Sequence, residues 1–255
     1  MKFSKYHGLG NDFIIVERPD IDTQDVVKLC NRRTGIGADG VLLINPGQSA
    51  PYSMRVLNAD GSEAEMCGNG LRCAAAYLVD KSLWHDQTLM LETGAGTLQV
   101  DMKDGLVSVH MGAVHDHGEK NISLDSQIVT GRFLSTGNPH FVLFGEKHYH
   151  DRSKLGPILC THPAFKSGAN ISFARLNQDQ SIDLVVWERG CGFTQACGTG
   201  ATATAAAAWV MGRIQVGPTR ICLPGGPLTI SGKLNGIIMT GPAVRVYDGH
   251  ADCLQ

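Results

Sequence analysis

The sequence lacks three features that would direct a protein to a membrane, to export or to nucleic acid. It contains no run of about 18 apolar residues, so we expect no membrane-spanning helix. Its first residues include Lys2, Lys5 and Asp12 without a continuous apolar core, which is unlike a signal peptide. Lysine and arginine number 22 against 24 aspartate and glutamate residues, a balance that predicts no basic surface for nucleic acid or anionic lipid.

The cysteines lack the spacing of a zinc site. No Cys-x-x-Cys motif is present, and a separation of six residues, as between Cys67 and Cys73 or between Cys191 and Cys197, is a poor pattern for metal ligands. A chain of 255 residues does not need disulfides to stabilise its core, and without an export signal a reducing cytoplasm is expected. We therefore predict a cytoplasmic protein without a metal. Cys73 and Cys191 are expected to be packing residues, and the cysteines taken as structural or surface thiols are Cys30, Cys160, Cys222 and Cys253.

Two short stretches share one pattern, Met-Cys-Gly-Asn-Gly at 66–70 and Ala-Cys-Gly-Thr-Gly at 196–200. An alanine-rich run follows each stretch, and because alanine is the best helix former, both runs predict helices. A thiol just before a helix lies beside unpaired backbone N–H groups and the positive end of the helix dipole. Such a position is expected to lower the pKa of a cysteine and to bind an anion such as a carboxylate. Two of these turns predict two thiols that face one carboxylate-bearing substrate.

The order of predicted elements occurs twice along the chain. Cys197 follows Cys67 by 197 − 67 = 130 residues, and Leu228 follows Leu98 by 228 − 98 = 130. The stretch 137–144 repeats the glycine turn and apolar strand of 10–16 with one residue added. We therefore predict an internal duplication into two homologous α+β lobes, with one of the two cysteines in each lobe.

A pair of acid/base thiols suits one kind of chemistry. Thiols on opposite sides of a carbon can remove a proton from one face and return a proton to the other, which racemises or epimerises that carbon without a cofactor. Helix N-termini aimed at the neighbouring carboxylate would stabilise the charge that develops on it. One thiol must be ionised while the other is protonated, so the two are expected to titrate as a coupled pair.

Taken together, the motifs resemble those of the diaminopimelate epimerase family, in order and over essentially the whole chain. They are GLGNDF at 8–13, NADGSE at 58–63, MCGNG at 66–70, GNPH at 137–140 and ERGCGFTQACGTG at 188–200. The resemblance implies cofactor-independent interconversion of LL- and meso-diaminopimelate by a thiolate/thiol pair, in lysine and peptidoglycan precursor biosynthesis. It also implies a homodimer.

The fold implied by the resemblance is α+β, with two pseudo-symmetric lobes. Each lobe is a curved, mainly antiparallel sheet around a central helix. Residues 1–115 are expected to form the N-terminal lobe, completed by a C-terminal strand at about 243–255, and residues 116–242 the C-terminal lobe.

The resemblance also assigns roles to individual residues. Cys67 and Cys197 take the positions of the catalytic pair, and His140 and Glu188 match positions that tune the thiols. Tyr247 stands at a position linked to dimerisation. The positions that contact substrate are Asn11, Asn58, Gly68, Asn69, Asn138, Asn170, Glu188, Arg189, Gly198 and Thr199, the two Gly-x pairs through their backbone N–H groups.

Two departures from the family pattern leave alternatives open. Phe193 stands where the family usually has a glutamate, and Gly40 stands where bacterial members often have glutamine. One alternative is a racemase of another amino acid on the same fold, such as histidine or proline, although the proline-racemase type usually has a histidine at the position of Asn69. The other is a non-catalytic binding protein or a phenazine-biosynthesis-like isomerase, which would need neither thiol.

Overall fold

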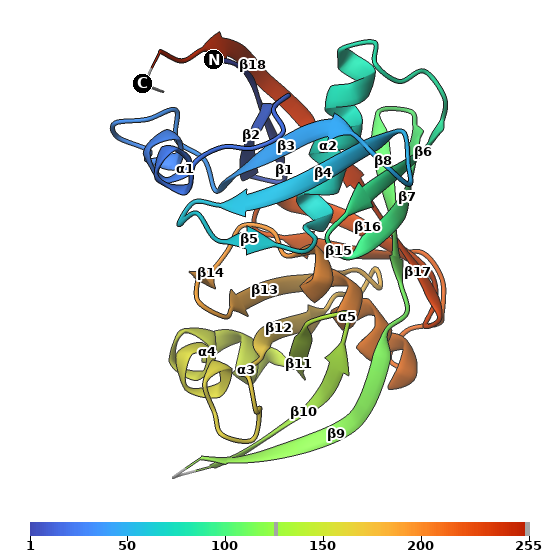
Figure 1. Ribbon diagram of the computed structural model, residues 1–255. Coiled ribbons are helices and arrows are strands. Elements are labelled where there is room, and N and C mark those ends of the chain that lie inside the picture. Colours follow the sequence, from blue (N-terminus) through green and yellow to red (C-terminus); the bar gives the residue numbers. More distant parts are fainter. Residues whose placement is uncertain (125–126, 253–255) are drawn as a thin grey trace. The chain divides into compact units, whose positions relative to one another are not determined.

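The computed structural model describes residues 1–124 and 127–252 (Figure 1). The chain divides into two compact units: unit 1 comprises Met1–His110 and Thr240–Gln255, and unit 2 comprises Met111–Met239. Each unit combines strands with helices, and each is described by itself below. None of the helices in the described ranges is long and apolar enough to cross a membrane.

Unit 1 is a mixed sheet built mainly from antiparallel pairs. Its parallel pairs are β2 with β3 and β4 with β6, while β1 pairs antiparallel with both β2 and the last strand, β18. The strands are β1 (Lys2–Gly8), β2 (Asn11–Val16), β3 (Gly40–Pro46), β4 (Tyr52–Asn58), β5 (Glu63–Ala64), β6 (Thr88–Thr93), β7 (Gly96–Lys103), β8 (Leu106–Gly112) and β18 (Val244–His250).

Helix α1 (Thr23–Cys30) begins at Thr23 because Asp22 caps it. The Asp22 carboxylate accepts a hydrogen bond of 2.8 Å from the backbone N–H of Gln24, which satisfies one of the open donors of the first turn. Val26 and Leu29 are buried on its inner side and pack in one cluster with apolar side chains of β2 and β3. Burial of this apolar side attaches the helix to unit 1.

Helix α2 (Gly68–Asp80) is the central helix of unit 1 and contacts β1, β2, β3, β4, β7 and β18. Ala74, Ala75, Leu71 and Leu78 are buried, and the small alanine side chains allow strands to approach the helix closely. One buried side chain is charged: the accessible surface of Arg72 is 0%. The alanine-rich run after Cys67 is therefore a helix, as predicted.

Unit 2 repeats the order of unit 1. Its parallel pairs are β11 with β12 and β13 with β15, which correspond to β2–β3 and β4–β6. The strands are β9 (His115–Leu124), β10 (Gln127–Ser135), β11 (Pro139–Phe144), β12 (Asn170–Leu176), β13 (Ile182–Glu188), β14 (Gly192–Phe193), β15 (Thr219–Leu223), β16 (Gly226–Lys233) and β17 (Gly236–Pro242). The helices are α3 (Glu146–His150), α4 (Arg152–Cys160) and α5 (Gly198–Val210).

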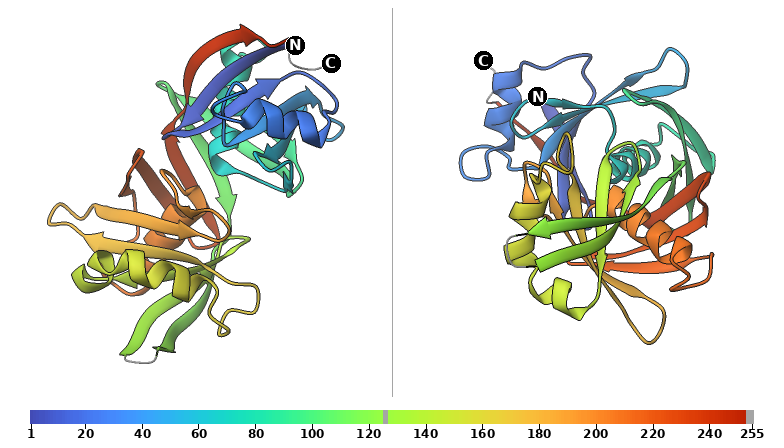
Figure 2. Two further views of the ribbon diagram at one scale, coloured as in Figure 1. Left: turned by 90° about the vertical axis from the view of Figure 1, so that its left-hand side faces the viewer. Right: turned by 90° about the horizontal axis from the view of Figure 1, so that it is seen from below.

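Helix α5 is the counterpart of α2 and contacts β10, β11, β12, β13, β15 and β16. Its alanines are buried all round, so it is a core helix rather than a surface helix with one apolar side. Figure 2 shows the ribbon of this helix in orange. Trp209 is buried in the last turn of α5, and its ring N–H donates a hydrogen bond of 2.9 Å to the hydroxyl of Thr219 on β15. The matching strand orders and the two central helices confirm the predicted duplication.

Candidate active site

Cys67 caps the N-terminus of α2 in unit 1. Its backbone is extended (φ −139°, ψ 113°), and its Sγ accepts a hydrogen bond of 3.4 Å from the backbone N–H of Gly70. A Cβ atom at Gly70 would lie 3.2 Å from Leu42 Cδ2 and 3.4 Å from Cys67 Cβ, so a glycine suits this tight turn. The thiol therefore lies at the positive end of the helix, as the sequence predicts.

Two asparagines lie beside Cys67. The side-chain oxygen of Asn11, at the start of β2, accepts a hydrogen bond of 3.0 Å from Asn69 Nδ2 and lies 4.0 Å from Cys67 Sγ. The Asn11 nitrogen donates to Asp39 at 2.8 Å. The predicted residues Asn11, Cys67, Gly68 and Asn69 thus come together in one cluster.

Asn58 and Gly40 pair at the ends of β4 and β3. Asn58 is exposed, and its side chain donates a hydrogen bond of 3.0 Å to the hydroxyl of Ser62. A Cβ atom at Gly40 would lie 2.6 Å from the carbonyl oxygen of Leu57. In this backbone a glutamine at position 40 would therefore clash, which gives the departure at Gly40 a local physical cause.

Cys197 caps α5 in the same way as Cys67 caps α2. Its Sγ accepts a hydrogen bond of 3.4 Å from the Gly200 N–H and lies 3.5 Å from the hydroxyl of Thr199. A Cβ atom at Gly200 would lie 2.9 Å from Val186 Cγ2 and 3.2 Å from Cys197 Sγ. Both halves of the duplication therefore place a thiol against a glycine at the third helical position.

The electrostatic environment of Cys197 corrects one expectation. Burial raises the pKa of its thiol well above the ordinary value, and the charge of Glu188 raises it further. Hydrogen bonds from Thr199 and Gly200 lower the pKa, but they are the smaller contributions. The pKa of the Cys197 thiol is therefore raised and not lowered as predicted, because desolvation of the thiolate outweighs the hydrogen bonds at the helix N-terminus.

Asn138 and His140 form a hydrogen-bonded group with Thr199. Asn138 Nδ2 lies 3.4 Å from the Thr199 hydroxyl, and Asn138 Oδ1 accepts from Thr136 at 3.0 Å. His140 Nε2 lies 3.1 Å from that same oxygen, so this nitrogen carries the proton. Burial lowers the pKa of His140 to about 3, and the imidazole is neutral at pH 7. His140 therefore orients Asn138 as a neutral donor.

Glu188 and its neighbours contact both β14 and the loop before β12. Thr194 donates its hydroxyl proton to Glu188, and the Arg189 guanidinium donates to the carbonyl of Ser167. The backbone N–H of Arg189 donates at 2.9 Å to the side-chain oxygen of Asn170. These contacts bring Asn170, Glu188 and Arg189 together.

Phe193, the second departure, packs edge-on against Trp187. Their ring centroids lie 4.9 Å apart with an interplanar angle of 80°, and Phe193 is 41% exposed. The hydroxyl of Thr194, the next residue, donates a hydrogen bond to Glu188. The side chain at 193 therefore makes an apolar contact in this structure.

Two charged residues of the Cys67 cluster were absent from the sequence-based predictions, namely Asp39 and Arg72. Asp39 accepts from Asn11, and Arg72 Nη2 donates to Asn69 Oδ1 at 2.9 Å. An arginine between Leu71 and Cys73 in an apolar, alanine-rich helix was a usable signal, because a buried cation needs a specific partner. Nothing in the sequence near Asp39 indicates its partner, since Asn11 lies far away along the chain.

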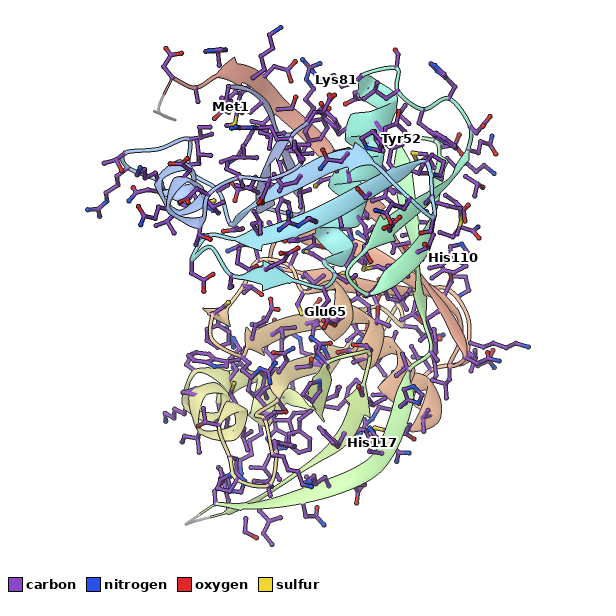
Figure 3. The ribbon with its side chains drawn as sticks, in the orientation of Figure 1. Met1, Tyr52, Glu65, Lys81, His110 and His117 are labelled. Carbon is purple, nitrogen blue, oxygen red and sulfur yellow. The ribbon has the colours of Figure 1, made fainter. Side chains whose placement is uncertain are left out.

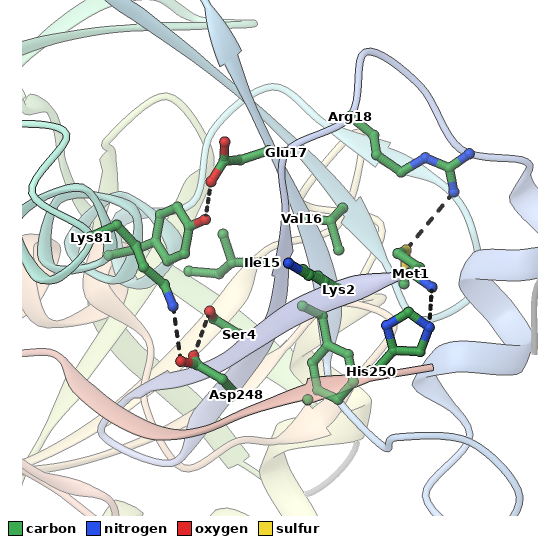
Figure 4. Close-up of a pocket in the computed structure, with 13 residues that line it drawn as sticks. Met1, Lys2, Ser4, Ile15, Val16, Glu17, Arg18, Lys81, Asp248 and His250 are labelled. Carbon is green, nitrogen blue, oxygen red and sulfur yellow. Dashed lines mark hydrogen bonds and ion pairs between the residues drawn. The ribbon is translucent and has the colours of Figure 1, made fainter. Parts of the chain in front are cut away.

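A separate hollow of about 950 Å³ lies in unit 1, between β1, β2, β18 and the end of α2 (Figure 4). Its two carboxylates have partners: Asp248 accepts from Ser4 at 2.7 Å and from Lys81 at 2.9 Å, while Tyr77 donates to Glu17. Lys81, which follows the last residue of α2, is also labelled in Figure 3. Neither Cys67 nor its neighbouring asparagines line this hollow, so it is distinct from the thiol cluster.

Within the described ranges, no group of three or more histidine, cysteine, aspartate or glutamate side chains could hold a metal ion. The cysteines at positions 30, 73, 160, 197 and 222 are free thiols. Cys73 is completely buried, as expected of a packing residue, and burial raises the pKa of its thiol. Cys191 is exposed, so the prediction that it packs in the core is wrong. Cys253 and its predicted role as a structural or surface thiol lie outside the described residues.

Comparison with known proteins gives one family and one fold. Residues 3–116 and 132–246 match the family model described as diaminopimelate epimerase. The diaminopimelate epimerase of Carboxydothermus hydrogenoformans is 38% identical over 98% of this chain and 98% of its own, and that of Synechocystis is 40% identical over 99% of each. Among solved structures, a hydroxyproline epimerase from Agrobacterium vitis has a TM-score of 0.73 at 17% identity, covering 98% of this chain and 90% of its own. A phenazine biosynthesis protein of the PhzF family from Bacillus anthracis has a TM-score of 0.73 at 15% identity over 98% of each chain. These two structures support the fold alone.

Proposed function

Because the chain belongs to the diaminopimelate epimerase family, we propose that it interconverts LL- and meso-2,6-diaminopimelate without a cofactor, in lysine and peptidoglycan precursor biosynthesis. The observation that carries this proposal at the level of residues is the pair of cysteines that cap α2 and α5. A binding protein would need neither thiol at these positions.

In the proposed reaction Cys67 and Cys197 act on opposite faces of one α-carbon. The thiolate of one cysteine takes the α-proton, and the electron pair of the broken C–H bond moves into the carboxylate as an enediolate-like species. The thiol of the other cysteine then gives its proton to the opposite face, which forms the new C–H bond and inverts the centre. At the end of a turnover the two cysteines have exchanged protonation states, so each direction of the reaction begins with the opposite state of the pair.

The helix N-termini are proposed to stabilise the charge that develops on the carboxylate. The backbone N–H groups of Gly68, Asn69, Gly198 and Thr199 belong to the first turns of α2 and α5, where helices bind anions. Donors that are already in place need no reorganisation when the charge forms. These four residues are therefore assigned to the reacting carboxylate.

The remaining polar residues are assigned to the rest of the substrate. Diaminopimelate has a second amino-carboxylate end, which requires both a cation and several hydrogen-bonding groups. Arg189 is exposed and can pair with a carboxylate, and Glu188 can accept from an ammonium group. The side chains assigned to substrate contact are Asn11, Asn58, Asn138, Asn170, Glu188 and Arg189, with His140 and Glu188 tuning the thiols.

We also propose that the enzyme is a homodimer that works in the cytoplasm. Strand β18 is exposed along nearly its whole length, and Val244, Val246 and Tyr247 are 45%, 52% and 44% exposed. Apolar side chains that are exposed together on one strand are typical of a surface that a partner covers. The free thiols of the described residues suit a reducing compartment.

Proton exchange tests the proposed reaction. Reduced protein is incubated with LL-diaminopimelate in deuterated water, and the α-hydrogen signal and the product's stereochemistry are followed by NMR. We expect one α-hydrogen to exchange as the meso isomer forms, with loss of activity in both Cys67→Ala and Cys197→Ala. Cys222→Ala is the matched control, because Cys222 is a partly buried thiol on β15 and not at a helix N-terminus. Exchange only with proline or histidine would instead favour a racemase, and no exchange with any amino acid would reject the proposal.

A further inference from the structure

A chain of hydrogen bonds passes beside Cys67 and joins a buried cation to an anion. Arg72 Nη2 donates to Asn69 Oδ1 at 2.9 Å, and Asn69 Nδ2 donates to Asn11 Oδ1 at 3.0 Å. Asn11 Nδ2 in turn donates to Asp39 Oδ2 at 2.8 Å. All four residues lie in unit 1.

The chemistry of the two end groups, Arg72 and Asp39, fixes the direction of each hydrogen bond in this series. A guanidinium group only donates hydrogen bonds, so Asn69 must present its oxygen to Arg72. A carboxylate only accepts, so Asn11 must present its nitrogen to Asp39. Each asparagine amide therefore has one orientation, and the Asn11 oxygen is the atom that faces Cys67 Sγ, 4.0 Å away.

Both ends are held in place by further contacts. Arg72 is completely buried, its Nε donates to the Pro242 carbonyl at 3.3 Å, and a Cβ atom at Gly8 would lie 2.9 Å from its Nη2. Asp39 accepts from Arg32 at 2.7 Å and from the backbone N–H of Asp12 at 3.2 Å. Neither charged group can turn away without losing a charge-assisted bond.

The matching position in unit 2 is oriented the other way. Asn138 Nδ2, not its oxygen, faces the Thr199 hydroxyl that lies beside Cys197. The residue five positions after Cys197 is Thr202, where the residue five positions after Cys67 is Arg72, and the Thr202 hydroxyl donates to the Gly198 carbonyl. The chain from cation to anion is therefore a feature of the Cys67 cluster and is not repeated at Cys197.

We propose that Asp39 is a positioning residue of the reaction, which acts through Asn11. By holding the Asn11 nitrogen, Asp39 keeps the Asn11 oxygen toward Cys67. This oxygen accepts a hydrogen bond from the Cys67 thiol and so keeps the neutral thiol oriented. An amide turned the other way would present N–H donors, which stabilise a thiolate instead. This inference rests on the proposed function only for the role of Cys67 as a reacting thiol.

The test is the substitution Asp39→Asn, which keeps the size of the side chain but lets position 39 donate to Asn11. The Asn11 amide is then held through its oxygen alone, by Asn69 Nδ2, and can turn when that one bond opens. We expect Cys67 to react about threefold to tenfold faster with iodoacetamide at neutral pH, because a turned amide offers the thiolate a hydrogen bond. We expect kcat for epimerisation to fall by about tenfold or more, because the orientation needed for proton transfer is lost. Mass spectrometry of the labelled peptides measures each cysteine separately, and the rate at Cys197 should not change.

Arg32→Gln is the matched control. It removes the ion pairs of Arg32 with Asp39 and Asp12, but the Asp39 carboxylate still accepts from Asn11 and from the Asp12 N–H, so the alkylation rate of Cys67 should stay near that of the wild type. An unchanged rate at Cys67 in Asp39→Asn would overturn the proposal, whatever happens to kcat. Equal changes at Cys67 and Cys197, or the same effect in Arg32→Gln, would also overturn it, because both would indicate general disturbance. Alkylation needs no substrate. The alkylation result can therefore be interpreted whether or not the wild-type protein epimerises diaminopimelate.

Discussion

The charge of Glu188 acts on the Cys197 thiol across a short distance, and it opposes ionisation of that thiol. A negative carboxylate disfavours a second negative charge, so its removal should lower the pKa of Cys197 and increase the thiolate fraction at a given pH. We predict that Glu188→Gln raises the rate of Cys197 alkylation at neutral pH by about tenfold, because a lower pKa increases the reactive thiolate fraction. The measurement is a pH series of iodoacetamide labelling.

Asp183→Asn is the control for that experiment. Asp183 lies on the same strand as Glu188 but is paired with Arg175 at 2.6 Å, so its loss should leave the Cys197 profile unchanged. A Glu188→Gln profile shifted to higher pH would contradict the electrostatic explanation. The same variant should lower kcat, since Glu188 is also proposed to bind substrate.

At Gly40 the constraint is steric rather than electrostatic. A Cβ atom there would lie 2.6 Å from the Leu57 carbonyl oxygen, which belongs to the neighbouring strand and cannot move aside cheaply. We predict that Gly40→Gln lowers the free energy of unfolding by about 1–3 kcal/mol. Urea titration measures this change, and Gly236→Ala is the control, because nothing lies within 4 Å of a Cβ atom at Gly236. Equal stability of Gly40→Gln and wild type would show that the strands adjust.

Among single residues, those whose role depends on local sequence could be predicted, and those whose role depends on burial could not. The cysteine caps follow from a Cys-Gly-x-Gly turn before an alanine-rich run, and the structure has both. The raised pKa of Cys197 depends on how far the folded chain removes the thiol from water, which no local pattern contains. Asp39 was missed for a similar reason, because its partner Asn11 is brought near only by the pairing of β2 with β3.

At the scale of elements, α1 offers a clean test of a helix cap. Asp22 is the N-cap residue, and its side chain accepts from the Gln24 N–H. Asp22→Ala should therefore lower the free energy of unfolding by about 1 kcal/mol, whereas Asp22→Asn, which keeps an accepting oxygen, should cost much less. Thermal or urea unfolding of the two variants measures the difference. If both variants lose the same stability, the charge rather than the cap bond matters.

The elements themselves could be predicted from the sequence where a repeat or a cap marked them. Helix α5 has no apolar stripe, since its alanines are buried all round, but its place after Cys197 identified it. The pairing of strands was not predictable from the chain. The parallel pairs β2–β3 and β11–β12 join strands that a helix separates in sequence, and only the packed sheet defines their register.

At the scale of the whole molecule, the proposed dimer can be tested through β18. Tyr247 packs edge-on against Phe3 at 5.9 Å yet remains 44% exposed, which leaves much of its ring for a partner. We predict that Tyr247→Ala shifts the protein from dimer to monomer in analytical ultracentrifugation. Val216→Ala is the control, since Val216 is 59% exposed but lies in unit 2, outside β18. A wild-type protein that sediments as a monomer at all concentrations would reject the dimer.

The return of the last strand to unit 1 has a consequence for protein synthesis. Unit 2 is one continuous stretch, whereas unit 1 contains β1 paired with β18, two strands from opposite ends of the sequence. A ribosome therefore makes all of unit 2 before it makes the strand that completes unit 1. During translation the unit that is begun first must wait for its last strand, and the unit that is begun second is the first whose strands have all been synthesised.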